Sequence, residues 1–520
     1  MIRITVNGKD YYMEAGQELG VFHRTHSAEG TSDSGGKGAR LSFACGGHGR
    51  CGKCKVKASG ALSAVTAAEE RCLGETGLAE GYRLACQVKA SGDCEISTGE
   101  PPQDKNGCVA IEGEMAEFEL LPSFSGYGAA VDIGTTTIAA KLFDDKGNEL
   151  SSFGMQNPQG RWGADVISRM EAALKGEAEN LAEAVRGAVN EIIDRIATLA
   201  GIAAKEDIRS VVITGNTVML YLLCGIDTEP LTHAPFEAKE LFGRSFPAAS
   251  IGLAAAPEAE LYIPPCIAAF IGADTVCAAL AVGLDRPGDP SIMTDIGTNG
   301  EMVIRSKKGL YACSTAAGPA FEGAGISMGM GGFEGAVDRV SIGEGDRLTA
   351  HVIGGEKGAR AIGICGSGLI DAVACLLELE AVDETGFMEE DECEIADGVR
   401  LIRNDIRAVQ LAKSAIHAGI LTLMHASGTA VGDVVTLSIA GGFGKFLNID
   451  NAGKIGLIPS ELVPRVSAAG NAALSGASML LLSVPARERA LSFSRMVDVV
   501  ELSTDPMFSQ EFMNQMAFEC

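Results

Sequence analysis

Aromatic side chains are scarce in this chain of 520 residues, where they make up 5% and include a single Trp. Basic residues are also few, because 42 Lys and Arg stand against 68 Asp and Glu, for a net charge of −26. A surface this negative repels phosphate backbones, so we expect no nucleic-acid partner. No apolar run reaches the roughly 18 residues that span a bilayer, so we expect no membrane insertion. The first residues lack the apolar core of a signal peptide, which predicts a cytoplasmic protein.

Glycine is plentiful, with 66 residues, and apolar residues make up 46% of the chain. Glycine serves where the backbone needs a positive φ or approaches a ligand closely. Residues 129–144 and 291–306 each read as strand, tight turn and strand, whereas residues 211–223, 361–379 and 434–448 read as strand, turn and helix. Strands that alternate with helices predict an α/β fold.

Seven of the 15 cysteines fall in the first 110 residues, and a cytoplasmic chain does not use such a group as a disulfide framework. Cys45, Cys51 and Cys54 follow the pattern C-x5-C-x2-C, and Cys86 stands further along. Three thiolates from one loop and a fourth from a distant segment are typical of 2Fe–2S sites, although the plant-type first gap is four residues. The glycines between these cysteines leave room for a cluster. We therefore predict that these four cysteines bind it.

Two other readings of the cysteines stay open. Structural zinc also takes four cysteines, but normally as two C-x2-C pairs, and only one such pair occurs here. Small buried thiols without a metal are the second alternative.

Two acidic turns repeat along the chain: Asp132-Ile-Gly-Thr and Asp295-Ile-Gly-Thr each follow an apolar strand and precede another. Such a turn offers backbone N–H groups and hydroxyls to phosphate oxygens, and its Asp can hold Mg²⁺ directly or through water. The repeat favours a duplicated fold with two turns that clamp a triphosphate from both sides. The predicted phosphate-site residues are Asp132, Gly134, Thr135, Thr136, Thr137, Asp295, Gly297, Thr298, Asn299, Gly300 and Glu301, of which Asp132, Asp295 and Glu301 are the catalytic candidates.

A Gly-rich turn after the strand at 434–440 would let an adenosine lie against bare backbone. Asp274 stands at the start of a predicted helix before the second acidic turn; it is either part of the site or an N-cap. The predicted nucleoside residues are Gly441, Gly442, Phe443 and Gly444.

In this order, these turns resemble the actin-like ATPase superfamily, and the cysteine unit resembles a 2Fe–2S ferredoxin of the adrenodoxin and plant type. Their pairing resembles the ATP-dependent reductive activators of corrinoid proteins, as do the segments NPQGRWGADVISRM, ITGNTVMLYLL, STAAGPAFEGAGISMGMG and GNAALSGASMLLLS. The resemblance adds Gly215 and Asn216 to the nucleotide site. It implies a β-grasp ferredoxin domain at 1–99, a linker at 100–126, a first ATPase part at 127–205 and a main ATPase domain at 206–520.

The resemblance implies a cycle in which one electron passes from the 2Fe–2S cluster to the Co(II) corrinoid of a methyltransferase system's corrinoid protein and restores Co(I). An unidentified low-potential donor loads the cluster, and Mg²⁺-ATP supplies the uphill step. The oligomeric state is left open, a homodimer included. Three alternatives remain: an activator of another metalloenzyme, a small-molecule kinase with a redox domain, and an electron-transfer protein with a degenerate ATPase fold.

Overall fold

The computed structural model describes residues 1–20, 41, 47, 49, 52, 54–98, 111–442 and 446–518. The chain divides into two compact units. Unit 1 comprises residues 1–106 and 158–181, and unit 2 comprises residues 107–157 and 182–520. Among the described helices, none combines the length and the apolar character needed to cross a membrane.

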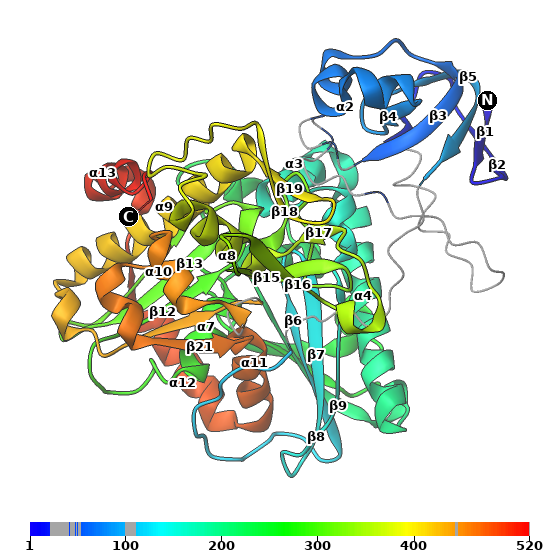
Figure 1. The fold of residues 1–520 in the computed structure, drawn as a ribbon. Helices are drawn as coiled ribbons and strands as arrows, with labels where there is room; N and C mark the ends of the chain where they lie inside the picture. Colours follow the sequence, from blue (N-terminus) through cyan, green and yellow to red (C-terminus); the bar gives the residue numbers. More distant parts are fainter. Residues whose placement is uncertain are drawn as a thin grey trace. The chain divides into compact units, whose positions relative to one another are not determined.

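Unit 1 contains a five-stranded sheet in the order β2-β1-β5-β3-β4 (Figure 1). A hairpin turn at Asn7 and Gly8, both at positive φ, joins β1 to β2 through two residues. Helix α2 starts with a capping box between Thr66 and Glu69, and the buried Glu69 carboxylate also pairs with Arg83 at 2.8 Å. The elements of this unit are β1 (Ile2–Val6), β2 (Lys9–Met13), β3 (Lys55–Leu62), α2 (Ala67–Ala79), β4 (Tyr82–Leu84), β5 (Ala90–Ser97), η1 (Pro158–Arg161), α3 (Val166–Ala172) and the π-helical η2 (Ala173–Glu177).

The first lobe of unit 2 is built on a six-stranded sheet in the order β10-β11-β9-β6-β7-β8. Strands β6, β7 and β8 form an antiparallel meander, and β9 and β11 continue the sheet in parallel with β6. The expected strand, turn and helix at 211–223 are β9 and α6. The elements are β6 (Tyr127–Ile133), β7 (Thr137–Asp144), β8 (Glu149–Gln156), α4 (Ala178–Ala200), α5 (Ala204–Asp207), β9 (Ile208–Gly215), α6 (Thr217–Cys224), β10 (Arg244–Pro247), β11 (Glu260–Ile263) and α7 (Ala273–Ala281).

The second lobe has the order β21-β20-β12-β13-β14-β22, and its first five strands repeat the arrangement β11-β9-β6-β7-β8 of the first lobe. Strands β12, β13 and β14 form the meander, and β20 and β21 continue it in parallel. Each acidic turn lies between the first two strands of its meander, so the duplication inferred from the repeat is present in the fold. The elements are β12 (Ser291–Ile296), β13 (Gly300–Arg305), β14 (Leu310–Thr315), α9 (Arg403–Ser427), β20 (Thr436–Ala440), α10 (Ile449–Lys454), β21 (Val466–Gly470), α11 (Ala472–Leu482), α12 (Val484–Met496), β22 (Val497–Val499) and α13 (Pro506–Asn514).

Two small sheets and one helix extend the second lobe between β14 and α9 (Figure 1). A short 3-10 helix, η5 (Pro319–Glu322), follows β14 and leads into this insertion. The remaining elements are β15 (Ala336–Ile342), β16 (Leu348–Val352), β17 (Gly363–Ile364), α8 (Gly366–Glu378), β18 (Glu392–Ala396) and β19 (Val399–Ile402).

Helices α7 and α11 join the two lobes through a shared apolar core. That core combines residues of both sheets, such as Val212 and Met293, with the inner faces of the two helices. The helices cross closely, because a Cβ on Gly476 would lie 2.0 Å from the carbonyl oxygen of Cys277. This crossing leaves the turn-bearing ends of both sheets free to form one site.

The segment at 111–126, placed by sequence in the linker, lies along unit 2. The Glu114, Ala116 and Leu121 N–H groups donate to carbonyl oxygens of residues 469, 281 and 482 at 2.8, 2.7 and 2.9 Å. The sequence resemblance placed a boundary between two ATPase parts at residue 205. In the structure, β6 and β9, which lie on either side of that residue, pair within one sheet. Composition does not reveal pairing between strands that lie so far apart in the sequence.

Candidate functional site

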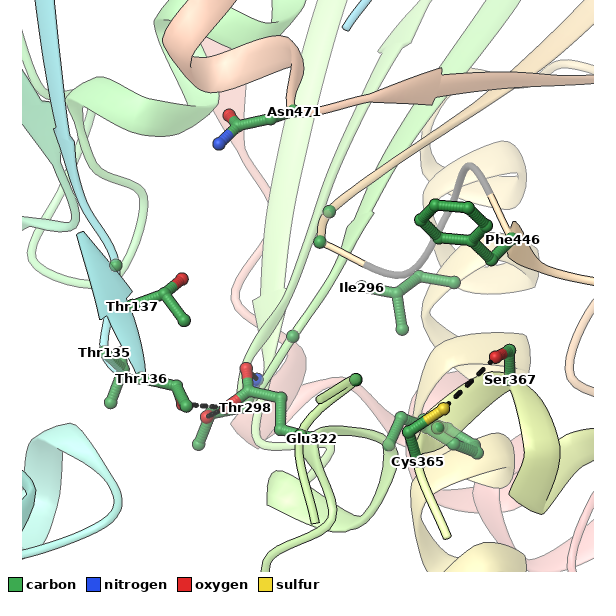
Figure 2. A pocket seen from close by; sticks show the side chains of 18 of the residues that line it. Thr135, Thr136, Thr137, Ile296, Thr298, Glu322, Cys365, Ser367, Phe446 and Asn471 are labelled. Atoms are coloured by element: carbon green, nitrogen blue, oxygen red, sulfur yellow. Dashed lines mark hydrogen bonds between the residues drawn. The ribbon is translucent and has the colours of Figure 1, made fainter. Parts of the chain in front are cut away.

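A cavity of about 540 Å³ lies between the two acidic turns of unit 2. It is bounded by the turn at 134–136 from the first lobe, the turn at 297–299 from the second, and the start of the Gly-rich turn after β20. Figure 2 shows Thr136 of the first turn and Thr298 of the second turn directed toward each other beside Glu322. Each turn lies at the corresponding end of its own sheet, and the fold brings the two ends together at one cavity. The two turns therefore face each other, as the repeat suggested.

The first turn is held by amide side chains from neighbouring elements. Asn157 Nδ2 donates to the carbonyl oxygen of Gly134 at 2.8 Å, and Asn216 Nδ2 donates to Thr135 Oγ1 at 3.3 Å. Asn216 also caps helix α6, because its Oδ1 accepts from the Met219 N–H at 2.9 Å. These bonds orient the turn so that its hydroxyls line the cavity.

The second turn and the Gly-rich turn approach each other closely. Gly441 has φ +108°, and a Cβ there would lie 2.6 Å from the Ile296 carbonyl oxygen and 2.9 Å from Asp295 Oδ1. Gly441 and Gly442 line the cavity, and so does Phe446, which is 54% exposed. Phe443 and Gly444, also predicted from the sequence, lie outside the described residues.

Four carboxyl groups from four elements line the cavity: Asp132 near the end of β6, Asp274 at the start of α7, Asp295 on β12 and Glu301, which pairs with Asp295 from β13. Glu301 is buried, and the three Asp residues are partly buried. Burial, reinforced by the charge of Asp274, raises the pKa of Asp132 to about 7. Burial and the charges of Asp274, Asp132 and Glu322 raise the pKa of Asp295 to about 8. Burial likewise raises the pKa of Asp274 to about 6 and that of Glu301 well above its ordinary value. No Lys, Arg or His side chain is among the causes of these four pKa shifts. A bound cation would therefore stabilise the ionised form of the carboxyl groups.

No three His, Cys, Asp or Glu side chains among the described residues converge closely enough to bind a metal ion by themselves. Mg²⁺ is usually bound through one or two carboxylates, with water and substrate phosphates completing the octahedron. The carboxyl groups therefore fit a cation that arrives with a phosphate ligand.

Most of the predicted nucleotide residues line the cavity, but Gly215 and Gly300 do not. Gly215 packs against the backbone of β6, since a Cβ there would lie 2.7 Å from the Ile133 carbonyl oxygen. Gly300 packs against α9, since its Cβ would lie 2.3 Å from Ile416 Cδ1. In both cases the structure assigns the glycine a packing role.

Several cavity residues were not singled out from the sequence. Glu322 accepts bonds from both acidic turns, and Asn471 Nδ2 donates to Asp132 Oδ2 at 3.2 Å. His351 and Asp338 pair on the hairpin of β15 and β16, with Nδ1 and Oδ1 2.5 Å apart, and they line another wall. Glu322 and Asn471 lie within the quoted segments STAAGPAFEGAGISMGMG and GNAALSGASMLLLS, which was the available signal.

A second candidate site lies in unit 1. Cys54 Sγ and Cys86 Sγ are both buried and 3.3 Å apart, at the start of β3 and after β4. Gln87 Nε2 donates to the Gly47 carbonyl oxygen at 3.0 Å, and Gly47, Gly49 and Gly52 all have positive φ. Cys45 and Cys51 lie outside the described residues. The described half of the predicted ligand set thus has two adjacent thiols beside a glycine-rich segment, which fits a thiolate-bound metal group.

The duplicated lobes with facing acidic turns define unit 2 as an actin-like nucleotide-binding fold. Comparison with known families agrees: residues 127–287 match the RACo middle region, and residues 289–520 match the C-terminal domain of RACo, the ASKHA domain. The predicted α/β architecture with an actin-like domain is confirmed.

Individual proteins give the same result. The corrinoid activation enzyme RamQ of Eubacterium limosum is 35% identical over 429 residues, which are 75% of this chain and 70% of RamQ. The [Co(II) methylated amine-specific corrinoid protein] reductase of Methanosarcina barkeri is 27% identical over 405 residues, 72% of each chain. A solved reductive activator for a corrinoid, iron–sulfur protein is 27% identical and covers 100% of this chain and 98% of its own, with a TM-score of 0.71.

This chain belongs to the RACo family of ATP-dependent reductive activators of corrinoid proteins. The prediction of a reductive activation enzyme is thereby confirmed. A separate similarity, 41% identity over 64 residues, links 12% of the chain to a component of the Na⁺-translocating NADH-quinone reductase of Haemophilus influenzae (strain PittEE).

Proposed function

We propose that this protein reduces the Co(II) corrinoid of a partner corrinoid protein to Co(I) by one electron, coupled to ATP hydrolysis. The observation that carries the proposal is that one chain combines the buried Cys54–Cys86 pair with a cavity flanked by two Asp-Ile-Gly-Thr turns. An unidentified low-potential donor supplies the electron. The corrinoid protein belongs to a methyltransferase system.

Residues 1–99 would form a 2Fe–2S ferredoxin domain, with Cys45, Cys51, Cys54 and Cys86 as ligands. When bound, such a cluster supplies a one-electron carrier of low potential, near roughly −400 mV for plant-type sites. Burial of Cys54 and Cys86 excludes water from the two described ligands, and the Gln87 amide lies 3.6 Å from Cys86 Sγ as a donor. Hydrogen bonds to ligand sulfurs and solvent exposure are the properties that tune the potential of such sites.

In unit 2, the turns at 134–136 and 297–299 would bind the phosphates of ATP through backbone N–H groups and threonine hydroxyls. Asp132 and Asp295 would hold Mg²⁺ directly or through water, and Glu301, the cross-strand neighbour of Asp295, would orient water beside them. Water attacks the terminal phosphorus, and the bond to the bridging oxygen breaks to leave ADP and phosphate. The turns supply donors where negative charge develops.

ATP can drive the electron uphill only by favouring a state of the protein with different contacts to the corrinoid partner. For a one-electron transfer, each ~59 mV of deficit costs a factor of ten in the equilibrium constant. The facing turns belong to different lobes of unit 2. A nucleotide bound between them therefore changes the position of one lobe relative to the other. We infer that this change is what the partner senses.

The test is an anaerobic assay of Co(I) formation, followed optically on a corrinoid protein, in which each component is omitted in turn. Reduced protein without ATP should stall because the electron must climb in potential, and ATP without reductant should stall because hydrolysis supplies no electron. Cys86→Ala should abolish the reaction because it removes a ligand of the electron carrier. Asp295→Asn should abolish it because it removes a ligand of Mg²⁺-ATP. Full reduction without nucleotide would refute the coupling, whereas ATP-dependent phosphorylation of a metabolite would favour the kinase alternative.

A further inference from the structure

Glu322 joins the two phosphate turns of unit 2 through its carboxylate. Its Oε1 accepts from the Thr298 N–H at 2.8 Å, and its Oε2 accepts from Thr298 Oγ1 at 2.9 Å. The same Oε2 accepts from Thr136 Oγ1 of the first lobe. Figure 2 shows Glu322 reaching toward Thr298 and Thr136. One acidic side chain therefore uses donors from both turns, including the kind of backbone N–H group that binds phosphate.

The backbone that carries Glu322 is tightly held. Phe321 is 2% exposed, and a Cβ on Gly366 would lie 2.0 Å from the Phe321 carbonyl oxygen. On the other side, Gly323 has φ +79°, and a Cβ there would lie 2.5 Å from the backbone of Met330. The short helix η5 therefore presents the carboxylate from a packed base, while the side chain itself ends in the cavity.

The second turn is shaped to admit this anion. A Cβ on Gly297 would lie 3.0 Å from Glu322 Oε1, so any larger residue would crowd the carboxylate. A phosphate oxygen and a carboxylate oxygen are both hydrogen-bond acceptors of negative charge, and they require the same donors. Two anions in this position would repel each other, and Glu322 already adds to the charge around Asp295.

We propose that Glu322 is a specificity-determining residue that takes the place of the terminal phosphate of a nucleoside triphosphate and is displaced by it. This inference rests on the ATP site of the proposed function. A ligand must carry a phosphate far enough to reach both turns before it can exchange with the carboxylate. A triphosphate meets that requirement, and a monophosphate does not. After hydrolysis and loss of phosphate, Glu322 regains Thr298 and Thr136, which favours release of the product.

The experiment is isothermal titration calorimetry of the full-length protein with Mg²⁺ and, in turn, a non-hydrolysable ATP analogue and AMP. Glu322→Gln removes the charge and Glu322→Ala removes the whole acceptor. Both should bind the triphosphate about tenfold tighter, the effect of roughly one charge-assisted hydrogen bond, and bind AMP within about twofold of wild type. Glu344→Gln is the matched control, because Glu344 is exposed and is not among the residues that line the cavity; it should change either affinity by less than about twofold.

A second measurement separates this contact from general charge relief. Hydrogen exchange of the Thr298 N–H should be faster in Glu322→Ala without nucleotide, and the triphosphate should restore protection. Glu322→Asp keeps the charge but shortens the side chain, so it serves if the other variants fail to fold; it should tighten triphosphate binding about threefold. Unchanged or weaker triphosphate binding in the variants, with wild type binding normally, would overturn the role of Glu322 alone. If neither wild type nor any variant bound nucleotide, the ATP site itself would be wrong, and this inference with it.

Discussion

Replacement of Asp295 by Asn should stabilise the protein without bound cation and abolish its use of Mg²⁺-ATP. Asp295 lies on β12 beside the cavity, where burial and three neighbouring acids raise its pKa from 3.8 to about 8. A carboxyl group with a raised pKa in the folded state binds its proton more tightly there than in the unfolded chain. It therefore costs stability as the pH rises from about 4 to about 8, and it costs nothing below that window.

The magnitude follows from the size of the pKa change. A shift of about four pH units corresponds to roughly 6 kcal/mol as an upper bound. The gain is smaller than this bound for two reasons. The neighbouring acids change their own protonation when Asp295 is removed, and the Asn amide must itself be desolvated and hydrogen-bonded at the same position. We therefore expect Asp295→Asn to gain about 2 kcal/mol in the free energy of unfolding at pH 8.

The assay is thermal denaturation in EDTA, followed by circular dichroism at pH 5 and pH 8. A gain of about 2 kcal/mol raises the Tm of a unit of this size by about 2–3 °C at pH 8, and we expect less than about 1 °C at pH 5. ATP turnover with Mg²⁺ should fall by at least about 100-fold, because the variant cannot hold the cation. Asp397→Asn, the same substitution at an exposed position, is the control and should change neither quantity. A lower Tm at pH 8, or an equal gain at both pH values, would refute this account of the carboxyl cluster.

Two further substitutions test the other contacts of the two sites. Asn471→Ala removes the hydrogen bond that lowers the pKa of Asp132, so that pKa should rise above about 7, and Mg²⁺-ATP affinity should fall several-fold at pH 7 and recover toward pH 8.5; a loss equal at both pH values would contradict this. Cys86→Ala should remove the visible absorption of the anaerobically purified protein while leaving ATP binding intact, whereas Cys94→Ala should keep the colour because Cys94 lies in the core on β5; zinc without iron in the purified protein would instead support a zinc site.

The sequence identifies both acidic turns, which the structure places around one cavity. Each acidic turn depends on a few consecutive residues: an apolar strand followed by an Asp, a Gly and hydroxyl side chains. Such a turn can therefore be recognised from the sequence. The hairpin turn at Asn7 and Gly8 is likewise local, because a two-residue turn of this kind requires positive φ at both residues. The repeat of the acidic turn also predicted two related lobes, which the matching strand orders bear out.

Two of the glycines predicted for the nucleotide site do not line the cavity. Gly215 and Gly300 adjoin the motifs and were assigned to the nucleotide, yet both serve close packing of backbone or side chains. A glycine next to a motif has the same local signal whether its missing Cβ makes room for a ligand or for a neighbouring element. Only the position of that neighbour, here β6 or α9, distinguishes the two cases.

By itself, the sequence predicted two acidic turns of the same kind, cysteines spaced as ligands, and a duplicated actin-like fold. These properties depend on short-range geometry and on repeats that can be read directly. The tertiary structure alone decided that Asn471 reaches Asp132 across 339 positions, and that Glu322 occupies donors of both turns. It also decided that four carboxyl groups from four elements line one cavity. Such contacts arise from how strands pair and helices cross, and no residue carries that information in its immediate neighbours.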